Sequence, residues 1–224
     1  MCGRYTLALD PEQLMERYGL SQIDIDFPPR YNIAPSQDNP IIVSDSDRRA
    51  IKLARWGLVP SWVKDKKGSY SLINARAETI AEKPTFKQLL KRQRCIVPAD
   101  GYYEWRKIPG QKQKTPMRFV RKDGRLFSFA GLWDWWQSSH GEDLQAYTIV
   151  TTEANSISEP IHNRMPAILS QENEERWLDS DDSDADRLAA LLKPYPSEEM
   201  EVYEVSRLVN SPSNDSPECI ARAG

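Results

Sequence analysis

The stretch RCIVPADGYYEWRKI, residues 94–108, is rich in apolar and aromatic side chains and is interrupted at Pro98-Ala99-Asp100-Gly101. Aromatic and β-branched residues favour strands, whereas proline and glycine inside such a run mark a break. The stretch therefore predicts a strand that is broken near Asp100. Glu104 lies between aromatic residues of this strand, where burying a carboxylate is costly unless it is paired or used.

The neighbouring segments predict further strands and a few short helices. Apolar or alternating runs indicate strands in residues 4–9, 39–45, 48–60, 144–154 and 200–206. Capping residues and helical spacing indicate helices in residues 10–20, 83–93 and 184–195, the first of which Asp10 can cap and Gly19 can end. Residues 166–180 indicate a short strand followed by a helix. Residues 117–136 predict a hairpin that turns at Asp123-Gly124, and the proline-interrupted residues 27–37 predict a loop.

Many strands with a few interspersed helices predict an α+β fold whose sheet is largely antiparallel and barrel-like, with short flanking helices. Neither an internal repeat nor a linker divides the sequence, so we expect one domain over residues 1–224. Residues 1–210 are expected to form the ordered core. The polar residues 211–224 are expected to form a loose tail.

The composition narrows the class of protein. The chain has 224 residues, of which 39% are hydrophobic and 28% charged, as is ordinary for a globular protein. It contains neither an apolar run long enough to span a membrane nor the apolar core of a signal peptide. Three cysteines without a CxxC motif and two histidines match no zinc signature. We therefore expect a monomeric cytoplasmic protein without a metal, a cofactor or a disulfide framework, associated with the nucleoid if bacterial.

Charge is distributed unevenly along the chain. Residues 1–130 carry 24 Lys and Arg against 14 Asp and Glu, whereas residues 131–224 carry 6 against 19. The basic half is compatible with binding to nucleic acid. The alternative is that the two oppositely charged segments fold against each other, and the charges alone favour this alternative.

Cys2 directly follows the initiator methionine. If Met1 is removed, Cys2 carries an α-amine and a thiol on adjacent carbons. An α-amine has an ordinary pKa of about 7.7–8.0, so it can attack a carbonyl near neutral pH without the burial that a lysine needs. The thiol can then close onto the imine to form a thiazolidine. The alternative is that Cys2 is only a small residue tolerated after methionine.

Three further residues are candidates for chemistry, each with a structural alternative. Asn74 can orient a hydroxyl or an amine, or it can cap the following turn. Glu104 can act as a general acid and base with a raised pKa, or it can form a salt bridge. His162 can protonate a leaving oxygen near neutral pH, or it can be structural.

Taken together, these segments resemble the SRAP family, which is named for the SOS-response-associated peptidase. The matching blocks extend from residue 1 to about residue 169, and the residues after that are weakly informative. The blocks are MCGRYTL, RYNIAPSQ, RWGLVPSW, INARAET, RCIVPADGYYEW, FAGLW and HNRMPAIL. The family's last block often reads His-Xaa-Arg-Met-Pro, and Xaa is Asn163 here.

The resemblance implies a DNA-damage function. Members of the family form a covalent thiazolidine link between the N-terminal cysteine and abasic sites in single-stranded DNA, which shields the lesion. Carried over by motif, Cys2 is the nucleophile after loss of Met1, and Asn74 orients the reactive groups. Glu104 is the acid and base, and His162 assists opening of the deoxyribose. Removal of Met1 by the protein itself and an abasic-site lyase activity are further expectations.

Binding to single-stranded DNA requires phosphate contacts and flat surfaces for the bases. The arginines beside the four catalytic candidates are predicted phosphate ligands, and other residues can stack or wedge bases. The predicted DNA contacts are Arg4, Pro35, Trp62, Arg76, Trp105 and Arg164. Core packing is the alternative for both tryptophans. The acidic half must then face away from the DNA, and replication-fork proteins are candidate partners.

Two other functions remain open from the sequence. One is an N-terminal-nucleophile cysteine peptidase, which needs an oxyanion hole and a base for its thiol. The other is a non-covalent reader of modified bases in DNA, which binds without Cys2. Formation of a covalent adduct with abasic DNA distinguishes the predicted function from the reader.

Overall fold

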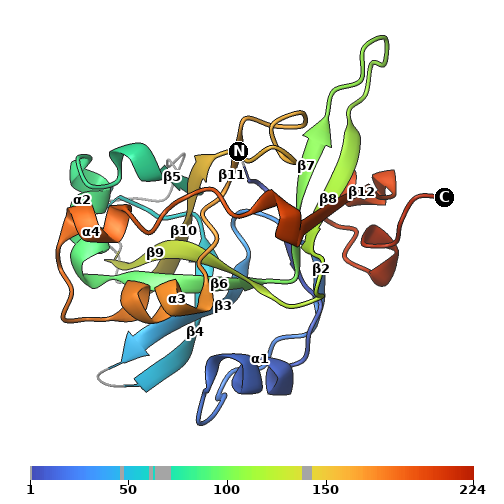
Figure 1. The fold of residues 1–224 in the computed structure, drawn as a ribbon. Helices are drawn as coiled ribbons and strands as arrows, with labels where there is room; N and C mark the ends of the chain where they lie inside the picture. Colours follow the sequence, from blue (N-terminus) through green and yellow to red (C-terminus); the bar gives the residue numbers. More distant parts are fainter. Residues whose placement is uncertain (1, 46–47, 61–62, 64–71, 138–142) are drawn as a thin grey trace.

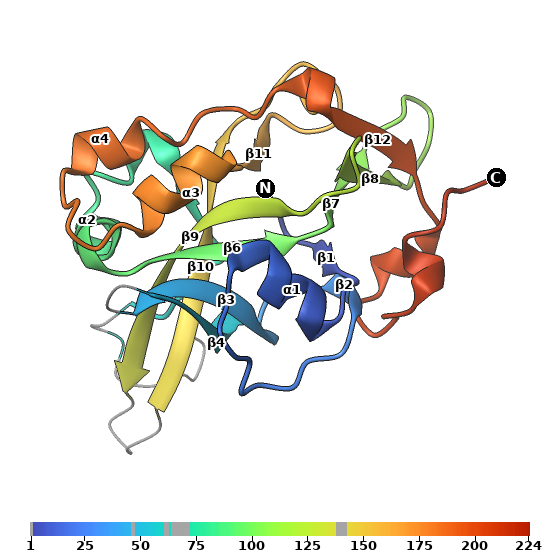
Figure 2. The same ribbon diagram turned by 60° about the horizontal axis from the view of Figure 1, so that its bottom comes forward.

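The computed structural model describes residues 2–45, 48–60, 63, 72–137 and 143–224. Its strands form a five-stranded sheet, in the order β12-β8-β7-β1-β2, and a seven-stranded sheet, in the order β11-β10-β4-β3-β6-β9 with β5 beside β10 (Figures 1 and 2). In the second sheet β9 also pairs with β10. This pairing closes the ring β10-β4-β3-β6-β9 into a barrel, as the sequence predicted.

The strands have the following bounds. The five-stranded sheet contains β1 (Tyr5–Leu7), β2 (Arg30–Ile33), β7 (Gly101–Arg106), β8 (Thr115–Arg121) and β12 (Met200–Glu204). The barrel and its two attached strands comprise β3 (Asp38–Asp45), β4 (Arg48–Trp56), β5 (Asn74–Arg76), β6 (Arg94–Ala99), β9 (Phe127–Gln137), β10 (Asp143–Glu153) and β11 (Arg164–Pro166).

The predicted break near Asp100 is the point at which the chain passes from the barrel to the five-stranded sheet. β6 pairs with β9 in the barrel, and β7 pairs with β1 and β8. Asp100 secures the crossing, because its carboxylate accepts hydrogen bonds from the Ala8 amide at 3.1 Å and from Arg118 at 2.7 Å. A Cβ at Gly101 would lie 2.8 Å from Nε of Arg118, so a side chain there would clash.

The predicted hairpin over residues 117–136 is wrong. The turn itself forms, with Gly124 at φ 70° and its amide donating to the Arg121 carbonyl at 3.2 Å. The strands on either side then part, because β8 pairs with β7 and β12 whereas β9 pairs with β6 and β10. The chain thus crosses between the sheets a second time, and each strand finds a partner from a distant part of the sequence.

The interpretation of residues 27–37 as loop is also partly wrong. Within it, β2 pairs antiparallel with β1, and Tyr5 lies opposite Ile33. β2 is an edge strand of its sheet, where neighbouring prolines cost few hydrogen bonds.

Helices cover the outside of the sheets. α1 (Pro11–Tyr18) has the predicted Asp10 cap, and Gly19 ends it at φ 64°. α2 (Pro84–Arg92), α3 (Gln171–Leu178) and α4 (Ala185–Ala189) gather at one end of the barrel (Figure 1). The 3-10 helices are η1 (Ala77–Thr79), η2 (Ser197–Glu199), η3 (Arg207–Asn210) and η4 (Pro217–Cys219).

Residues 211–224 are tied to the five-stranded sheet, which corrects the expectation of a loose tail. The carboxylate of Asp215 accepts hydrogen bonds from the Tyr31 amide at 2.5 Å and the Asn32 amide at 2.9 Å, and it pairs with Arg30. Cys219 is fully buried in a small cluster against Tyr103. The sequence did not predict these contacts, because the segment is held mainly by hydrogen bonds and carries no apolar stripe that would mark it as packed.

Candidate active site

Cys2 lies at the start of the chain segment that becomes β1. The Tyr103 amide donates to the Arg4 carbonyl at 3.0 Å, and Tyr5 lies opposite Tyr102. The antiparallel pairing with β7 thus continues back toward Cys2, whose side chain is fully buried. Burial raises the pKa of the Cys2 thiol, and the Glu104 carboxylate raises it further. The thiol is therefore protonated at neutral pH, and a carboxylate stands close enough to influence it.

Glu104 lies on β7, opposite Met117 of β8, and is only 5% exposed. Burial raises the pKa of its carboxyl to about 7. A carboxyl with this pKa is present in both forms near neutral pH, so it can accept a proton in one step and return it in another.

Asn74 begins β5, which pairs parallel with β10 so that Asn74 lies opposite Ile149. Its Nδ2 donates to the Ile149 carbonyl at 3.5 Å, whereas its buried Oδ1 has no hydrogen-bond partner among the described residues. Arg76 occupies the N-cap position of the following 3-10 helix, η1, and no side chain forms a capping hydrogen bond there. The buried Oδ1 of Asn74 is therefore not used to cap this helix.

His162 lies in the loop between β10 and β11 and is half-buried. Its Nδ1 accepts a hydrogen bond from the Arg164 amide at 3.1 Å. Burial lowers the pKa of the imidazole, and the nearby charges of Lys114 and Arg164 lower it further. The ring is therefore neutral at pH 7, and because Nδ1 accepts, its proton is on Nε2.

The loop that carries His162 is joined to β7 by Ser158. The Ser158 hydroxyl lies 3.2 Å from the Tyr102 hydroxyl, and its carbonyl accepts from the His162 amide at 2.9 Å. β5 and β11 both pair with β10. Glu104 thus comes from the five-stranded sheet, Asn74 from a strand attached to the barrel, and His162 from the loop that leads into β11, another such strand.

The sequence model of the SOS response associated peptidase (SRAP) family matches residues 1–212. The chain belongs to the SRAP family. The predicted membership is therefore confirmed.

Individual relatives cover almost the whole SRAP domain. The abasic site processing protein YoqW of Bacillus subtilis (strain 168) is 46% identical over 222 residues, which cover 98% of this chain and 99% of YoqW. The abasic site processing protein HMCES of Rattus norvegicus is 34% identical over 271 residues, covering 100% of this chain and 76% of HMCES. A crystal structure of a protein from Bacteroides thetaiotaomicron superposes with a TM-score of 0.87 at 34% identity, covering 99% of this chain and 100% of that one.

Two of the predicted phosphate ligands of this SRAP domain lie beside β10. Arg76 is exposed at the end of β5, opposite Thr151. Arg164 forms a two-point ion pair with Glu78 at 2.7 and 3.0 Å and donates to the Thr151 carbonyl at 2.6 Å. Arg76 is thus available to a ligand as it stands, whereas Arg164 must share or exchange its contact with Glu78.

Arg4 and Trp105 have structural partners. Arg4 donates to Oδ1 of Asn32 and to the Val209 carbonyl, both at 2.7 Å, and its guanidinium lies 5.8 Å from the Trp105 ring centroid. The Trp105 indole donates to Oδ1 of Asn210 at 2.7 Å. These contacts tie both residues to the C-terminal segment, and their contact with DNA stays a prediction.

The other two predicted DNA contacts are less informative. Pro35 is half-buried in the turn between β2 and β3. Trp62 lies outside the described residues, as does Met1.

Sequence reasoning missed the polar residues that support this region. Asn32 is fully buried, and its Nδ2 donates to three carbonyls, those of Val209, Ser211 and Asn214, at 3.2, 2.9 and 2.7 Å. The block RYNIAPSQ contains Asn32, but a motif does not identify partners some 180 residues away. Ser158 was missed for the same reason.

The described residues contain no group of three or more His, Cys, Asp or Glu side chains arranged to hold a metal ion. None of the helices in this part of the chain has both the length and the apolar character needed to cross a membrane.

Proposed function

We propose that the protein crosslinks itself through Cys2 to abasic sites in single-stranded DNA and so shields them. The observation that carries the proposal is the pairing of a buried N-terminal cysteine with Glu104, a buried carboxyl whose pKa is raised to about 7. The relatives named as abasic site processing proteins support the same substrate class.

The proposed reaction starts when loss of Met1 frees the α-amine of Cys2. The open-chain sugar of an abasic site presents an aldehyde, which the amine attacks to give a carbinolamine. Loss of water from the carbinolamine, with a proton supplied to the departing hydroxyl, gives a protonated imine. The Cys2 sulfur then adds to the carbon of the C=N bond, so that a C–S bond forms, the C=N electron pair returns to the nitrogen, and the thiol gives its proton to a base. The product is a thiazolidine, and no oxidant or reductant is consumed.

Glu104 supplies the proton transfers that these steps need. In its protonated form it donates a proton to the departing hydroxyl of the carbinolamine. The resulting carboxylate can take the proton of the thiol as the sulfur attacks, which compensates for the raised pKa of Cys2. A group that titrates near neutral pH performs both transfers with little energetic penalty.

His162 and Asn74 are assigned to the sugar and the amine. The neutral His162 can donate a hydrogen bond from Nε2–H to the ring oxygen and so stabilise the charge that develops there as the closed sugar opens to the aldehyde. The buried Oδ1 of Asn74 can accept a hydrogen bond from the attacking amine or from a sugar hydroxyl, which would satisfy an acceptor that has no partner among the described residues. Arg76 and Arg164 are assigned to the flanking phosphates.

A lyase activity follows from the same intermediate. An imine that the thiol does not trap can undergo β-elimination, which cuts the strand. Removal of Met1 by the protein itself is the peptide reaction to which the family's name would apply, with Glu104 as the nearby proton acceptor.

The test is a denaturing gel of the purified protein with single-stranded DNA that contains one abasic site. The expected result is a heat-stable adduct that forms without reductant, and intact-mass measurement of the protein should show the loss of one methionine. An adduct formed by protein that retains Met1 would refute the mechanism. Retention of abasic DNA only under native conditions would indicate the non-covalent reader instead.

A further inference from the structure

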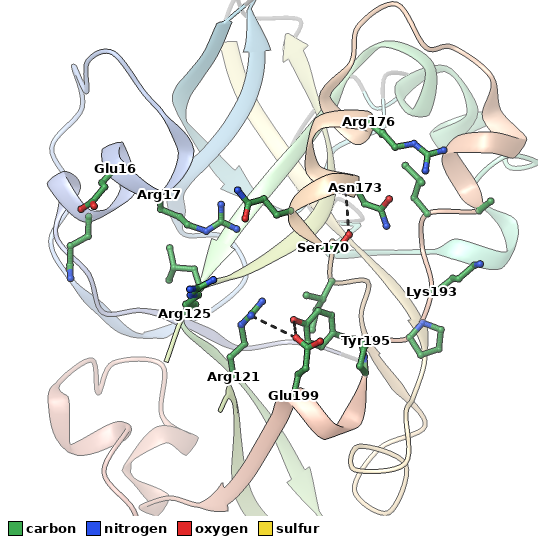
Figure 3. Close-up of a pocket in the computed structure, with 18 residues that line it drawn as sticks. Glu16, Arg17, Arg121, Arg125, Ser170, Asn173, Arg176, Lys193, Tyr195 and Glu199 are labelled. Atoms are coloured by element: carbon green, nitrogen blue, oxygen red, sulfur yellow. Dashed lines mark hydrogen bonds and ion pairs between the residues drawn. The ribbon is translucent and has the colours of Figure 1, made fainter. Parts of the chain in front are cut away.

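A cleft apart from the candidate active site lies between α1, the β8–β9 turn, the start of α3 and residues 190–199 (Figure 3). This cleft has a volume of about 860 Å³. Cys2, Asn74, Glu104 and His162 do not line it. A ligand in the cleft would therefore leave the candidate active site open.

The rim of the cleft carries cations that lack close anionic partners. The Arg125 side chain is 73% exposed, and its nearest carboxylate is that of Asp123 at 3.9 Å. Arg176 and Lys193 are exposed and form no ion pair among the described residues. In Figure 3 Arg125 lies on one side of the cleft, and Arg176 and Lys193 lie on the other.

Two more arginines line the cleft but are already neutralised. Arg17 pairs with the buried Glu174 at 2.5 Å. Arg121 pairs with Asp123 at 2.6 Å and approaches Glu199 at 3.8 Å. The positive charge available to a ligand therefore comes from the three rim cations. One carboxylate without a cationic partner among the described residues, that of Glu16, opposes it on the wall of the cleft.

The remaining lining is partly polar and partly aliphatic. Gln13, Ser170, Gln171 and Asn173 supply neutral hydrogen-bonding groups. Leu126, Ile168 and Leu191 also line the cleft but are only 5%, 4% and 8% exposed, and Pro194 and Pro196 stand beside them. These side chains offer a small apolar surface beside the rim cations. An aliphatic side chain flanked by carboxylates would match both features.

The single aromatic residue in the cleft is not open for stacking. The Tyr195 ring packs edge-on against Phe127 at 6.0 Å between centroids, and Arg121 lies 5.6 Å from the Tyr195 centroid. The Tyr195 hydroxyl donates to Glu199 at 2.5 Å. Single-stranded nucleic acid needs exposed aromatic faces for its bases. The lining therefore favours a peptide over a DNA strand.

We propose that this cleft docks a short extended segment of a partner protein that carries acidic side chains around an aliphatic or proline anchor. The carboxylates would face Arg125, Arg176 and Lys193, and the anchor would contact Leu126 and Ile168. Docking here would recruit the partner while Cys2 is bound to DNA.

The test is selection from a library of random 12-residue peptides against the intact protein, followed by fluorescence anisotropy with the enriched peptides. Enrichment in Asp or Glu next to Leu, Ile or Pro is expected, with affinity that falls as salt rises. The double variant Arg125→Glu and Lys193→Glu should weaken these peptides at least 10-fold. Both side chains are exposed, so the variant is expected to fold.

The matched control is Lys83→Glu with Lys87→Glu, which makes the same change in charge at α2, away from the cleft. It should leave peptide affinity within about 2-fold of the wild type. Enriched peptides that lack acidic residues, or that bind the cleft variant as tightly as the wild type, would overturn the proposal. A 30-nucleotide single strand that loses affinity for the cleft variant and not for the control would assign the cleft to DNA and also overturn it.

Discussion

The barrel and the five-stranded sheet keep their buried groups in place by different means. The interior of the barrel is filled by apolar and aromatic side chains such as Trp56, which stacks on Tyr147 at 6.4 Å between centroids. The five-stranded sheet shares this apolar core through Tyr102 and Phe119, and it adds buried polar contacts, such as Arg118 with Asp100 and Asn32 with Arg4. Apolar packing tolerates small changes of shape, whereas a buried polar network fails when one member is removed.

This difference has a consequence for the site. Glu104 belongs to the five-stranded sheet, and Cys2 lies just before its strand β1. Asn74 belongs to β5, which is attached to the barrel, and His162 lies in the loop before β11. The reactive groups therefore depend on how precisely the two sheets meet, and single substitutions on the polar side should have the larger effects. The following predictions test this contrast in order of decreasing effect.

The largest effect is expected for Cys2→Ser. The variant keeps the α-amine but replaces the thiol with a poorer trap for the imine. The heat-stable adduct should fall to background, while an adduct that borohydride can trap persists and strand cleavage increases. The measurement is a denaturing gel of the wild type and the variant, each with and without borohydride. Equal amounts of heat-stable adduct without reductant would falsify the thiazolidine mechanism.

Glu104→Gln should slow crosslinking by about 10²–10⁴-fold, the usual contribution of a general acid and base. Because burial raises the pKa of Glu104 to about 7, the wild-type rate should show an inflection near pH 7 that the variant lacks. Single-turnover rates from pH 5.5 to 8.5 would measure it. An unchanged inflection in the variant would assign the titration to another group.

The same substitution should also change stability in a pH-dependent way. The folded-state pKa of Glu104 is raised, so its contribution to stability is greatest below the ordinary glutamate pKa and is lost as the pH rises through about 7. Glu104→Gln removes this loss. The variant should therefore gain up to about 3 kcal/mol relative to the wild type between pH 4.5 and pH 8. Urea unfolding at both pH values would test this, and a constant difference would contradict it.

Asn32→Ala should lower the free energy of unfolding by about 1–3 kcal/mol, because it leaves the Arg4 guanidinium and several buried carbonyls without a partner. The matched change in the barrel is Ile42→Val, which should cost about 0.5–1.5 kcal/mol. Urea unfolding compares the two. A larger cost for Ile42→Val would reverse the contrast between the sheets.

The smallest effect is expected for Arg76→Ala. Removing one exposed cation from a phosphate contact should weaken single-stranded DNA binding uniformly across sequences and reduce the slope of log K against log salt by about 1. Arg222→Ala is the control, because the Arg222 side chain already forms an ion pair with Glu201 of β12. A salt slope that stays the same in Arg76→Ala would remove Arg76 from the DNA interface.

The sequence by itself determined the local features of this protein and its family. Asp10 and Gly19 predicted both ends of α1, because a cap is a contact between residues only a few positions apart. The spaced blocks from MCGRYTL to HNRMPAIL identified the SRAP family and proposed Cys2, Asn74, Glu104 and His162, whose roles stay predictions. Apolar periodicity predicted that strands exist and that the sheet is barrel-like.

Only the tertiary structure decided which strands pair and what the polar residues contact. β8 and β9 flank the predicted turn yet join different sheets, because pairing energy depends on partners far along the chain. Arg4 could be proposed as a phosphate ligand from its position beside Cys2, but its guanidinium is bound to Asn32 and Val209. The sequence predicted a raised pKa for Glu104 from its aromatic neighbours, but the value of about 7 depends on a burial that only the folded chain creates. Interactions within one turn depend only on neighbouring residues, so the sequence predicts them, whereas burial and long-range pairing exist only once the chain has folded.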